Sequence, residues 1–179
     1  MNAPGPRGES GDDVAFRLMH NSFVRLFWRM ELFEQTLASI TEHGYHVVRL
    51  DASAWTQQAD LHRDIAAALD FPDYYGENLS ALNDCLRDVV AGEYGADASA
   101  AGFVLAFTGY DKFTAHCPHE AHVVLDIIAD QARRALLTGY RVCCLVQSDD
   151  PMIRFEPVGA MPVMWNEAEW LDSRRRPDA

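Results

Sequence analysis

The chain lacks the sequence features of secreted, membrane-spanning and nucleic-acid-binding proteins. Its first residues do not show a basic segment followed by an apolar one, which is the pattern of a signal peptide. No apolar run approaches the roughly 20 residues that a membrane-spanning helix needs. Basic residues are scarce, since 15 Lys and Arg stand against 27 Asp and Glu and leave a net charge of −12. We therefore expect a cytoplasmic protein that binds neither a membrane nor a nucleic acid, whose phosphates reward clusters of Lys and Arg.

Cysteines and the common catalytic motifs are also few. Four cysteines do not make a disulfide framework in 179 residues, so we expect reduced, buried thiols in a reducing compartment. The chain has neither a glycine-rich phosphate-binding loop nor a G-x-S-x-G turn. Cys85 lies close to Leu82 and Leu86, which favours a buried and unreactive thiol over a nucleophile. Without a set of acid, base and nucleophile, we do not expect an enzyme.

One segment concentrates potential metal ligands. His116, Cys117, His119 and His122 fall within seven residues, and imidazole and thiolate groups are ligands of zinc. Their spacing matches no zinc-binding pattern, however, and Pro118 is typical of the first turn of a helix. We therefore interpret the segment as a solvated helix start, and expect neither a metal nor a cofactor.

The hydrophobic pattern predicts an α/β fold. A short run rich in β-forming residues, Tyr45–Leu50, follows a glycine, and apolar runs of strand length occur at Gly102–Phe107 and Tyr140–Val146. Amphipathic patterns predict helices at 56–69, 79–90 and 121–137. Residues 91–101, rich in Gly, Ala, Asp and Ser, are predicted to form a loop, and residues 108–113 a turn. This order of elements predicts a small three-stranded parallel sheet flanked by helices.

The segments on either side of residues 46–147 are interpreted as extensions. Residues 1–13, rich in Pro, Gly and acidic residues, are expected to form a disordered tail. Residues 14–45 are predicted to be helical, because the dense apolar positions between Ser22 and His43 fit one helix, or two pieces broken near Arg29. Phe27 and Trp28 are interpreted as core residues, with an exposed partner surface as the alternative.

The C-terminal extension, residues 148–179, contains several prolines and is predicted to begin as an extended or looped segment. The residues Trp165–Leu171 are interpreted as a short terminal helix. Three consecutive arginines, Arg174 to Arg176, are too few to indicate a nucleic-acid site, and we expect them to form a solvated tail.

The most informative stretch runs from Phe71 to Leu86. Pro72 should end the preceding helix, because proline fixes its own φ and disfavours helical geometry at Phe71. Gly76 favours a tight turn, and Asn78, or alternatively Asp73, can cap the next helix. The predicted buried stripe of this helix is Leu79, Leu82, Leu86 and Val90. Its opposite side carries Arg87 and a compact polar patch of Ser80, Asn83 and Asp84.

This stretch resembles the barstar family of ribonuclease inhibitors. The run Pro-Asp-Tyr-Tyr-Gly-Glu-Asn-Leu-Ser-Ala-Leu-Asn-Asp-Cys-Leu, residues 72–86, carries the resemblance, which extends over residues 46–147. The resemblance implies the α/β fold described above, and a protein that acts by occluding a ribonuclease or related basic toxin with its loop and helix 73–88. It implies partner contacts at Asp84, which matches the principal contact aspartate of the family, and around it at Tyr74, Glu77, Asn78, Ser80 and Asn83.

The chain departs from the family pattern at several contact positions. Ser80 replaces a second aspartate and Asn83 a tryptophan, while Val89 stands at another tryptophan position. Arg134 and Thr138 stand where the family has acidic residues. These departures predict a target other than barnase itself, because specificity depends on complementarity rather than on the fold. Two alternatives stay open: an interaction or regulatory module that has lost ribonuclease inhibition, and an ordinary solvated helix face.

Overall fold

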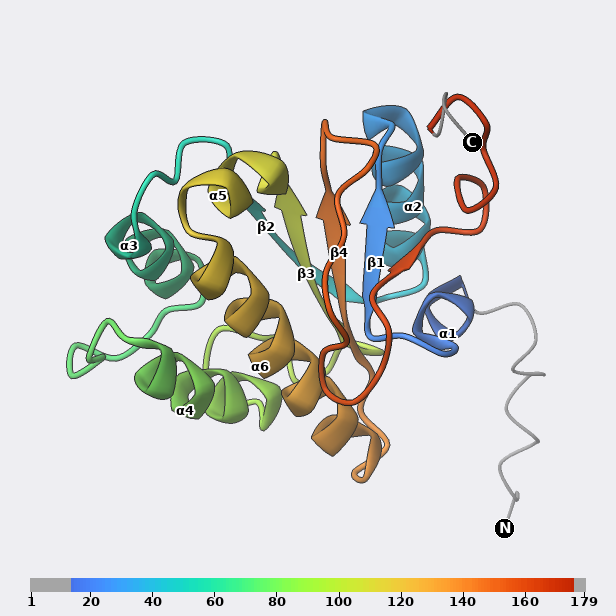
Figure 1. Ribbon diagram of the computed structural model, residues 1–179. Helices are drawn as coiled ribbons and strands as arrows, with labels where there is room; N and C mark the ends of the chain where they lie inside the picture. The colour runs from blue at the N-terminus through green and yellow to red at the C-terminus, as the bar shows by residue number, and fades with distance from the viewer. Residues whose placement is uncertain (1–13, 176–179) are drawn as a thin grey trace, which may run out of the picture.

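The computed structural model describes residues 14–175, so the tail predicted at residues 1–13 lies outside the described residues, as does Arg176. Five parallel strands form one sheet in the order β2-β3-β4-β1-β5 (Figure 1). They are β1 (Val24–Phe27), β2 (His46–Asp51), β3 (Phe103–Thr108), β4 (Val142–Gln147) and β5 (Met164–Trp165). The three predicted strands are β2, β3 and β4, which lie side by side, but the prediction of a sheet with only three strands is wrong.

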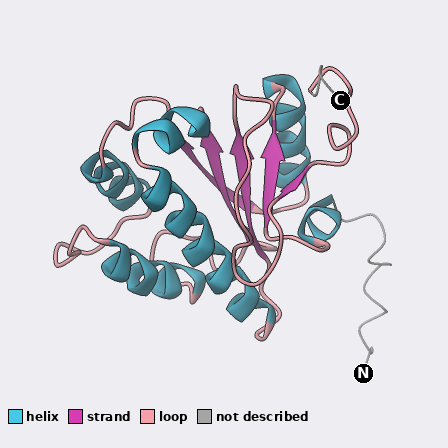
Figure 2. Cartoon of the chain, viewed as in Figure 1, coloured by secondary structure: helices cyan, strands magenta, loops and turns pink. Residues whose placement is uncertain are grey.

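Helices cover both faces of this sheet, which gives a three-layered molecule (Figure 2). One face packs against α3 (Gln58–Ala68), α4 (Leu79–Val90), α5 (Tyr110–His116) and α6 (Pro118–Leu136). The other face packs against α1 (Val14–Met19) and α2 (Met30–Glu42). Because side chains alternate along a strand, Phe103, Leu105 and Phe107 of β3 point to the first layer, and Val104 and Ala106 to the second. This burial on both faces explains the uninterrupted apolar run.

The N-terminal segment contains a strand where a helix was predicted. Strand β1 lies between β4 and β5, with Leu26 facing one layer of the core and Phe27 the other. Helix α2 begins only after Arg29, whose backbone is extended. A break near Arg29 is therefore confirmed, and Val14–Met19 is helical as predicted, whereas the helical prediction is wrong for Val24–Phe27. The short stretch Phe23–Trp28, mostly apolar but interrupted by Arg25, cannot be assigned to a strand or a helix by its periodicity alone.

The C-terminal segment also differs from its prediction. Met164 and Trp165 form β5, which pairs with β1, and turns follow it, so the prediction of a terminal helix at Trp165–Leu171 is wrong. Arg175 is buried rather than solvated. Its guanidinium donates to the carbonyl oxygens of Glu169, Pro151 and Trp170 at 2.9, 3.0 and 3.1 Å and stacks 4.2 Å from the ring of Trp165. These partners satisfy the buried cation and hold the segment against the sheet.

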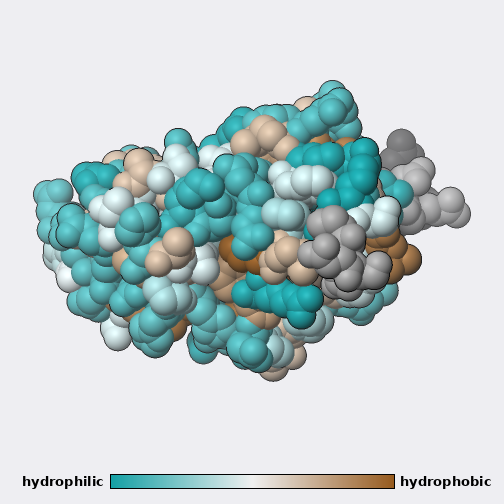
Figure 3. Space-filling model, turned by 45° about the horizontal axis from the view of Figure 1, so that its top comes forward, coloured by the Kyte–Doolittle hydropathy of each residue, from teal (hydrophilic) through white to brown (hydrophobic). Residues whose placement is uncertain are grey.

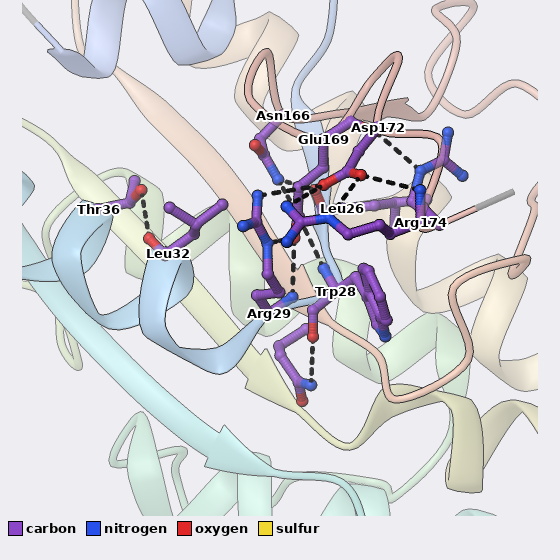
Figure 4. Close-up of polar contacts among 11 residues, drawn as sticks. Leu26, Trp28, Arg29, Leu32, Thr36, Asn166, Glu169, Asp172 and Arg174 are labelled. Carbon is purple, nitrogen blue, oxygen red and sulfur yellow. Dashed lines mark hydrogen bonds and ion pairs between the residues drawn. The ribbon is translucent and has the colours of Figure 1, made fainter. Parts of the chain in front are cut away.

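The two extensions meet at Glu169, as Figure 4 shows. This carboxylate is fully buried and accepts hydrogen bonds from the backbone N–H groups of Trp28 and Arg29, both at 2.9 Å. It also forms an ion pair with Arg29 at 3.1 Å and accepts a hydrogen bond from Asn166. An anion placed just before a helix is favoured by the unpaired N–H groups there. Glu169 thus caps the start of α2 from the other end of the chain.

Two local predictions need correction. Residues predicted to form a turn after β3 begin the short helix α5. The amphipathic pattern at 121–137 also predicts that Leu136 belongs to the buried side of α6, but this residue lies at the last turn and is 46% exposed. Within residues 14–175, no helix combines the length and the apolar character needed to cross a membrane. The face seen in Figure 3 is largely hydrophilic, with apolar residues in small separate areas.

Candidate partner-binding surface at residues 73–88

The loop before α4 is anchored by one of its two adjacent tyrosines. The ring of Tyr75 packs against Phe71, with ring centroids 4.8 Å apart, and its hydroxyl oxygen lies 2.5 Å from Nδ1 of the buried His62 in α3. Burial lowers the pKa of His62, against the opposing effect of Glu77, and burial also raises the pKa of Tyr75. Tyr74, by contrast, points outward and is 80% exposed. One tyrosine therefore fixes the loop, and its neighbour is presented to the surroundings.

Asn78 begins α4, as one of the two predicted caps. Its Oδ1 accepts a hydrogen bond from the N–H of Ala81 at 3.0 Å, and its Nδ2 donates to the carbonyl of Gly76 at 3.0 Å. The left-handed backbone in this loop falls on Glu77, with a φ of 47°, and not on Gly76. A Cβ at Gly76 would instead come within 3.1 Å of the Asn78 side chain, so glycine leaves room for the cap. These contacts give the loop a defined shape before any partner binds.

Helix α4 buries a stripe that differs slightly from the predicted one. Leu82, Cys85, Leu86 and Val89 are buried against the core, while Leu79 and Val90 flank them and are half-buried. The helix packs along α6, at the side of the molecule away from α1 and α2 (Figure 1). The packing fixes which side of α4 faces outward. Of the predicted contact residues, Tyr74, Glu77, Asn78, Ser80 and Asp84 all lie exposed there.

Asn83 lies at the edge of this surface and differs from the other predicted contacts. It is half-buried, and its Oδ1 accepts a hydrogen bond from Nε2 of Gln131 in α6 at 2.8 Å. Gln131 is itself buried. A buried amide needs such a partner, because an unsatisfied polar group costs about 1–3 kcal/mol. At this position the structure shows a contact between two helices, and the side-chain oxygen of Asn83 is already in use.

Arg87 lies on the outward side of α4, as predicted, but its pairing with two carboxylates was not predicted. Its Nη1 lies 3.3 Å from Oδ1 of Asp84, and its Nε lies 3.2 Å from Oδ1 of Asp88. The side chains of Arg87 and Asp84 are 56% and 62% exposed. The spacing D-x-x-R-D could have revealed the arrangement, because side chains three residues apart are neighbours on a helix. Asp84 is therefore exposed but paired, in a contact that is worth about 0–1 kcal/mol in water.

Other candidate sites receive little support within residues 14–175. No group of three or more His, Cys, Asp or Glu side chains is placed there to hold a metal ion. The histidine-rich segment joins α5 to α6, which begins at Pro118 as predicted. Hollows of about 240, 260 and 310 Å³ lie beside β1 and the C-terminal segment, and none of their lining residues falls in 73–88. The surface at 73–88 thus resembles a projecting protein contact more than a small-molecule pocket.

Comparison with known proteins identifies the family. The family model described as Barstar (barnase inhibitor) matches residues 45–147, which is more than half of the chain. The chain belongs to the barstar family. It is also similar to a Bacillus subtilis (strain 168) protein named "Putative ribonuclease inhibitor YrdF", with 69% identity over 26 residues. That match covers 14% of this chain and 29% of the relative, so it spans less than a third of the relative's length.

Proposed function

We propose that this protein is an inhibitor that binds a ribonuclease, or a related basic toxin, through the loop and helix 73–88 and thereby occludes the active site. The observation that carries the proposal is the exposed carboxylate of Asp84 on the outward side of α4, at the position of the family's principal contact. A carboxylate in that place can form charge-assisted hydrogen bonds with cationic groups that otherwise hold substrate phosphate. The protein itself is proposed to have no enzymatic activity.

The preorganisation of the surface supports this function. Tyr75 and His62 fix the loop, Asn78 caps the helix, and the buried side of α4 packs against the core. A rigid surface loses little conformational freedom on binding, so more of the contact energy appears as affinity. The net charge of −12 favours rapid encounter with a basic partner. The partner is proposed to be a protein, with no role for nucleic acid or membrane.

The cysteines agree with action in the cytoplasm, which remains part of the proposal. All four lie within residues 14–175, and none forms a disulfide. Cys85, Cys143 and Cys144 are buried, and burial raises the pKa of the Cys144 thiol, which leaves it unreactive. Reduced thiols in these positions suit a reducing compartment.

A second candidate function is an interaction or regulatory module that keeps the fold without inhibiting a ribonuclease. Asn83 favours this alternative, because its side-chain oxygen is engaged by Gln131. Ser80 also brings no charge to the centre of the surface. Under this alternative the acidic character of α4 is incidental.

The deciding experiment is a titration of the purified protein into barnase-type ribonucleases, and into ribonucleases encoded by neighbouring genes, while RNA cleavage is followed. We expect stoichiometric loss of cleavage with one of them, and an association rate that falls as salt is added. Asp84→Ala should weaken the complex by about 2 kcal/mol or more, while leaving the protein folded.

Glu34→Ala is the matched control, because Glu34 is also an exposed carboxylate paired with an arginine, Arg49, but lies on α2 on the other side of the sheet. It removes the same charge away from the proposed contact. If Asp84→Ala and Glu34→Ala weaken the complex equally, Asp84 contributes only through the net charge of the protein and not through a direct contact. Full cleavage with every ribonuclease would favour the interaction module.

A further inference from the structure

The outward side of α4 is not uniformly acidic, because the cation of Arg87 lies between the carboxylates of Asp84 and Asp88. Ser80, Asp84 and Arg87 are separated by four, three and seven positions, so they lie together on the side of the helix opposite the buried stripe. Asp88 lies at the edge of the same side and is half-buried. The guanidinium of Arg87 bridges the carboxylates of Asp84 and Asp88. The residues closest to the proposed contact therefore form an alternating set of charges.

Any partner that covers Asp84 must cover Arg87 as well, because the two charged groups are only 3.3 Å apart. A guanidinium carries five N–H donors. The contacts to Asp84 and Asp88 use one donor on Nη1 and one on Nε, so three donors of this exposed side chain remain for a partner. Burying a cation whose donors are not satisfied is strongly unfavourable. Binding at Asp84 thus sets a requirement for acceptors opposite Arg87.

We infer that the partner surface is of mixed charge: beside the cation that meets Asp84, it carries a carboxylate that receives Arg87. This inference rests on the proposed function and specifies the partner more closely. Arginine suits such a role, because its planar group binds a carboxylate through two parallel hydrogen bonds. Arg87 then discriminates among ribonucleases, since an active site lined by cations alone would repel it.

Removing Arg87 should change the affinity in opposite directions for a mixed-charge partner and for a purely cationic one. If the partner site holds only cations, removing Arg87 relieves repulsion and tightens the complex. If it holds a carboxylate opposite Arg87, the same change leaves that carboxylate unpaired and weakens the complex. The pairing of Arg87 with Asp84 does not obscure the result, because an exposed ion pair of this kind contributes little to stability.

The experiment measures inhibition by the full chain of the ribonuclease that it inhibits best, using wild-type protein, Arg87→Ala and Arg63→Ala. Arg63 is a matched control, because it makes the same D-x-x-R-D arrangement on α3, with Nη1 2.8 Å from Asp60 and Nε 2.8 Å from Asp64. We expect Arg87→Ala to weaken inhibition at least about tenfold, and Arg63→Ala to change it less than about threefold. Replacing one carboxylate of the enzyme's active site with its amide should abolish the effect of Arg87→Ala.

Two other results would overturn the inference in different ways. If Asp84→Ala weakens inhibition while Arg87→Ala leaves it unchanged or strengthens it, the proposed function stands and the mixed-charge partner is wrong. If no ribonuclease is inhibited by the folded wild-type protein, the proposed function fails and the inference fails with it. Circular dichroism and denaturation of each variant establish that the compared proteins are folded.

Discussion

Replacing Glu169 with alanine should destabilise the whole protein, although this residue lies only a few positions from the end of the described chain. The carboxylate is fully buried and joins the C-terminal segment to the start of α2. Its loss removes the acceptor of two backbone N–H groups, of Trp28 and Arg29, and the ionic partner of the Arg29 side chain. It also removes an acceptor of the Asn166 amide.

The expected loss follows from these contacts. Each backbone donor left without an acceptor costs about 1–1.5 kcal/mol at the low end of the usual range, which is appropriate because both residues are half-buried. The side-chain contact with Arg29 adds little, since Arg29 is about a third exposed and water screens the pair. The total is about 3 kcal/mol, a substantial part of the 5–15 kcal/mol that stabilises a typical domain. Glu169→Gln, which keeps one acceptor oxygen, should cost roughly half as much.

The assay is urea denaturation followed by circular dichroism and tryptophan fluorescence. Glu156→Ala is the control, because Glu156 is an exposed carboxylate in the same C-terminal segment and should change stability by less than about 0.5 kcal/mol. Equal stability of Glu169→Ala and wild type would refute the capping role. A lower slope of the transition, with only part of the structure lost, would show that the C-terminal segment unfolds separately from the sheet.

Two further predictions concern the support of the candidate surface. Leu82→Ala should cost about 2–5 kcal/mol of stability, because Leu82 is fully buried. Ser80→Ala, on the outward side of α4, should cost little. Equal costs for the two substitutions would mean that the register of α4 is wrong. Burial lowers the pKa of His62 below its unfolded value near 6.5, so the unfolded chain binds more protons and stability is lost as the pH falls below about 6.5. Denaturation at pH 8 and pH 5 should show that His62→Gln loses less unfolding free energy than the wild type between these two pH values. Equal losses in the two proteins would contradict the role of His62 in the pH dependence.

The sequence predicts those parts of the fold that are set by local pattern. Strands β3 and β4 are apolar runs between turn residues, β2 is a short segment with β-branched residues that follows a glycine, and α3, α4 and α6 have clear helical periodicity. Strand β1 escapes this reasoning because Leu26, Met30, Phe33 and Leu37 also have helical spacing, although they belong to a strand and a following helix. Its assignment depends on pairing with β4, more than 100 residues away along the chain.

In the candidate surface, too, some features follow from the local sequence and others depend on residues that are distant along the chain. The Asn78 cap and the exposure of Asp84 follow from neighbours within one helical turn. The inward position of Tyr75 depends on His62, and the position of Asn83 depends on Gln131, which is 48 residues away. Contacts between distant elements are not visible in a single sequence. Arg87 is a different case, because its spacing from Asp84 and Asp88 is a local signal that was present and not used.

The arrangement of the layers separates the two extensions from the candidate surface. Val104, Ala106, Cys143 and Leu145 form an apolar face of the central strands, and α2 covers it from the N-terminal segment. Without that segment, the region that matches the barstar family would expose this face to water, at a cost of about 25 cal/mol for each Å² of apolar area. Helix α4 lies on the opposite side of the sheet (Figure 1). The extensions can therefore stabilise the sheet without covering the residues that are proposed to bind a ribonuclease, so substitutions such as Glu169→Ala and Asp84→Ala should affect stability and inhibition independently.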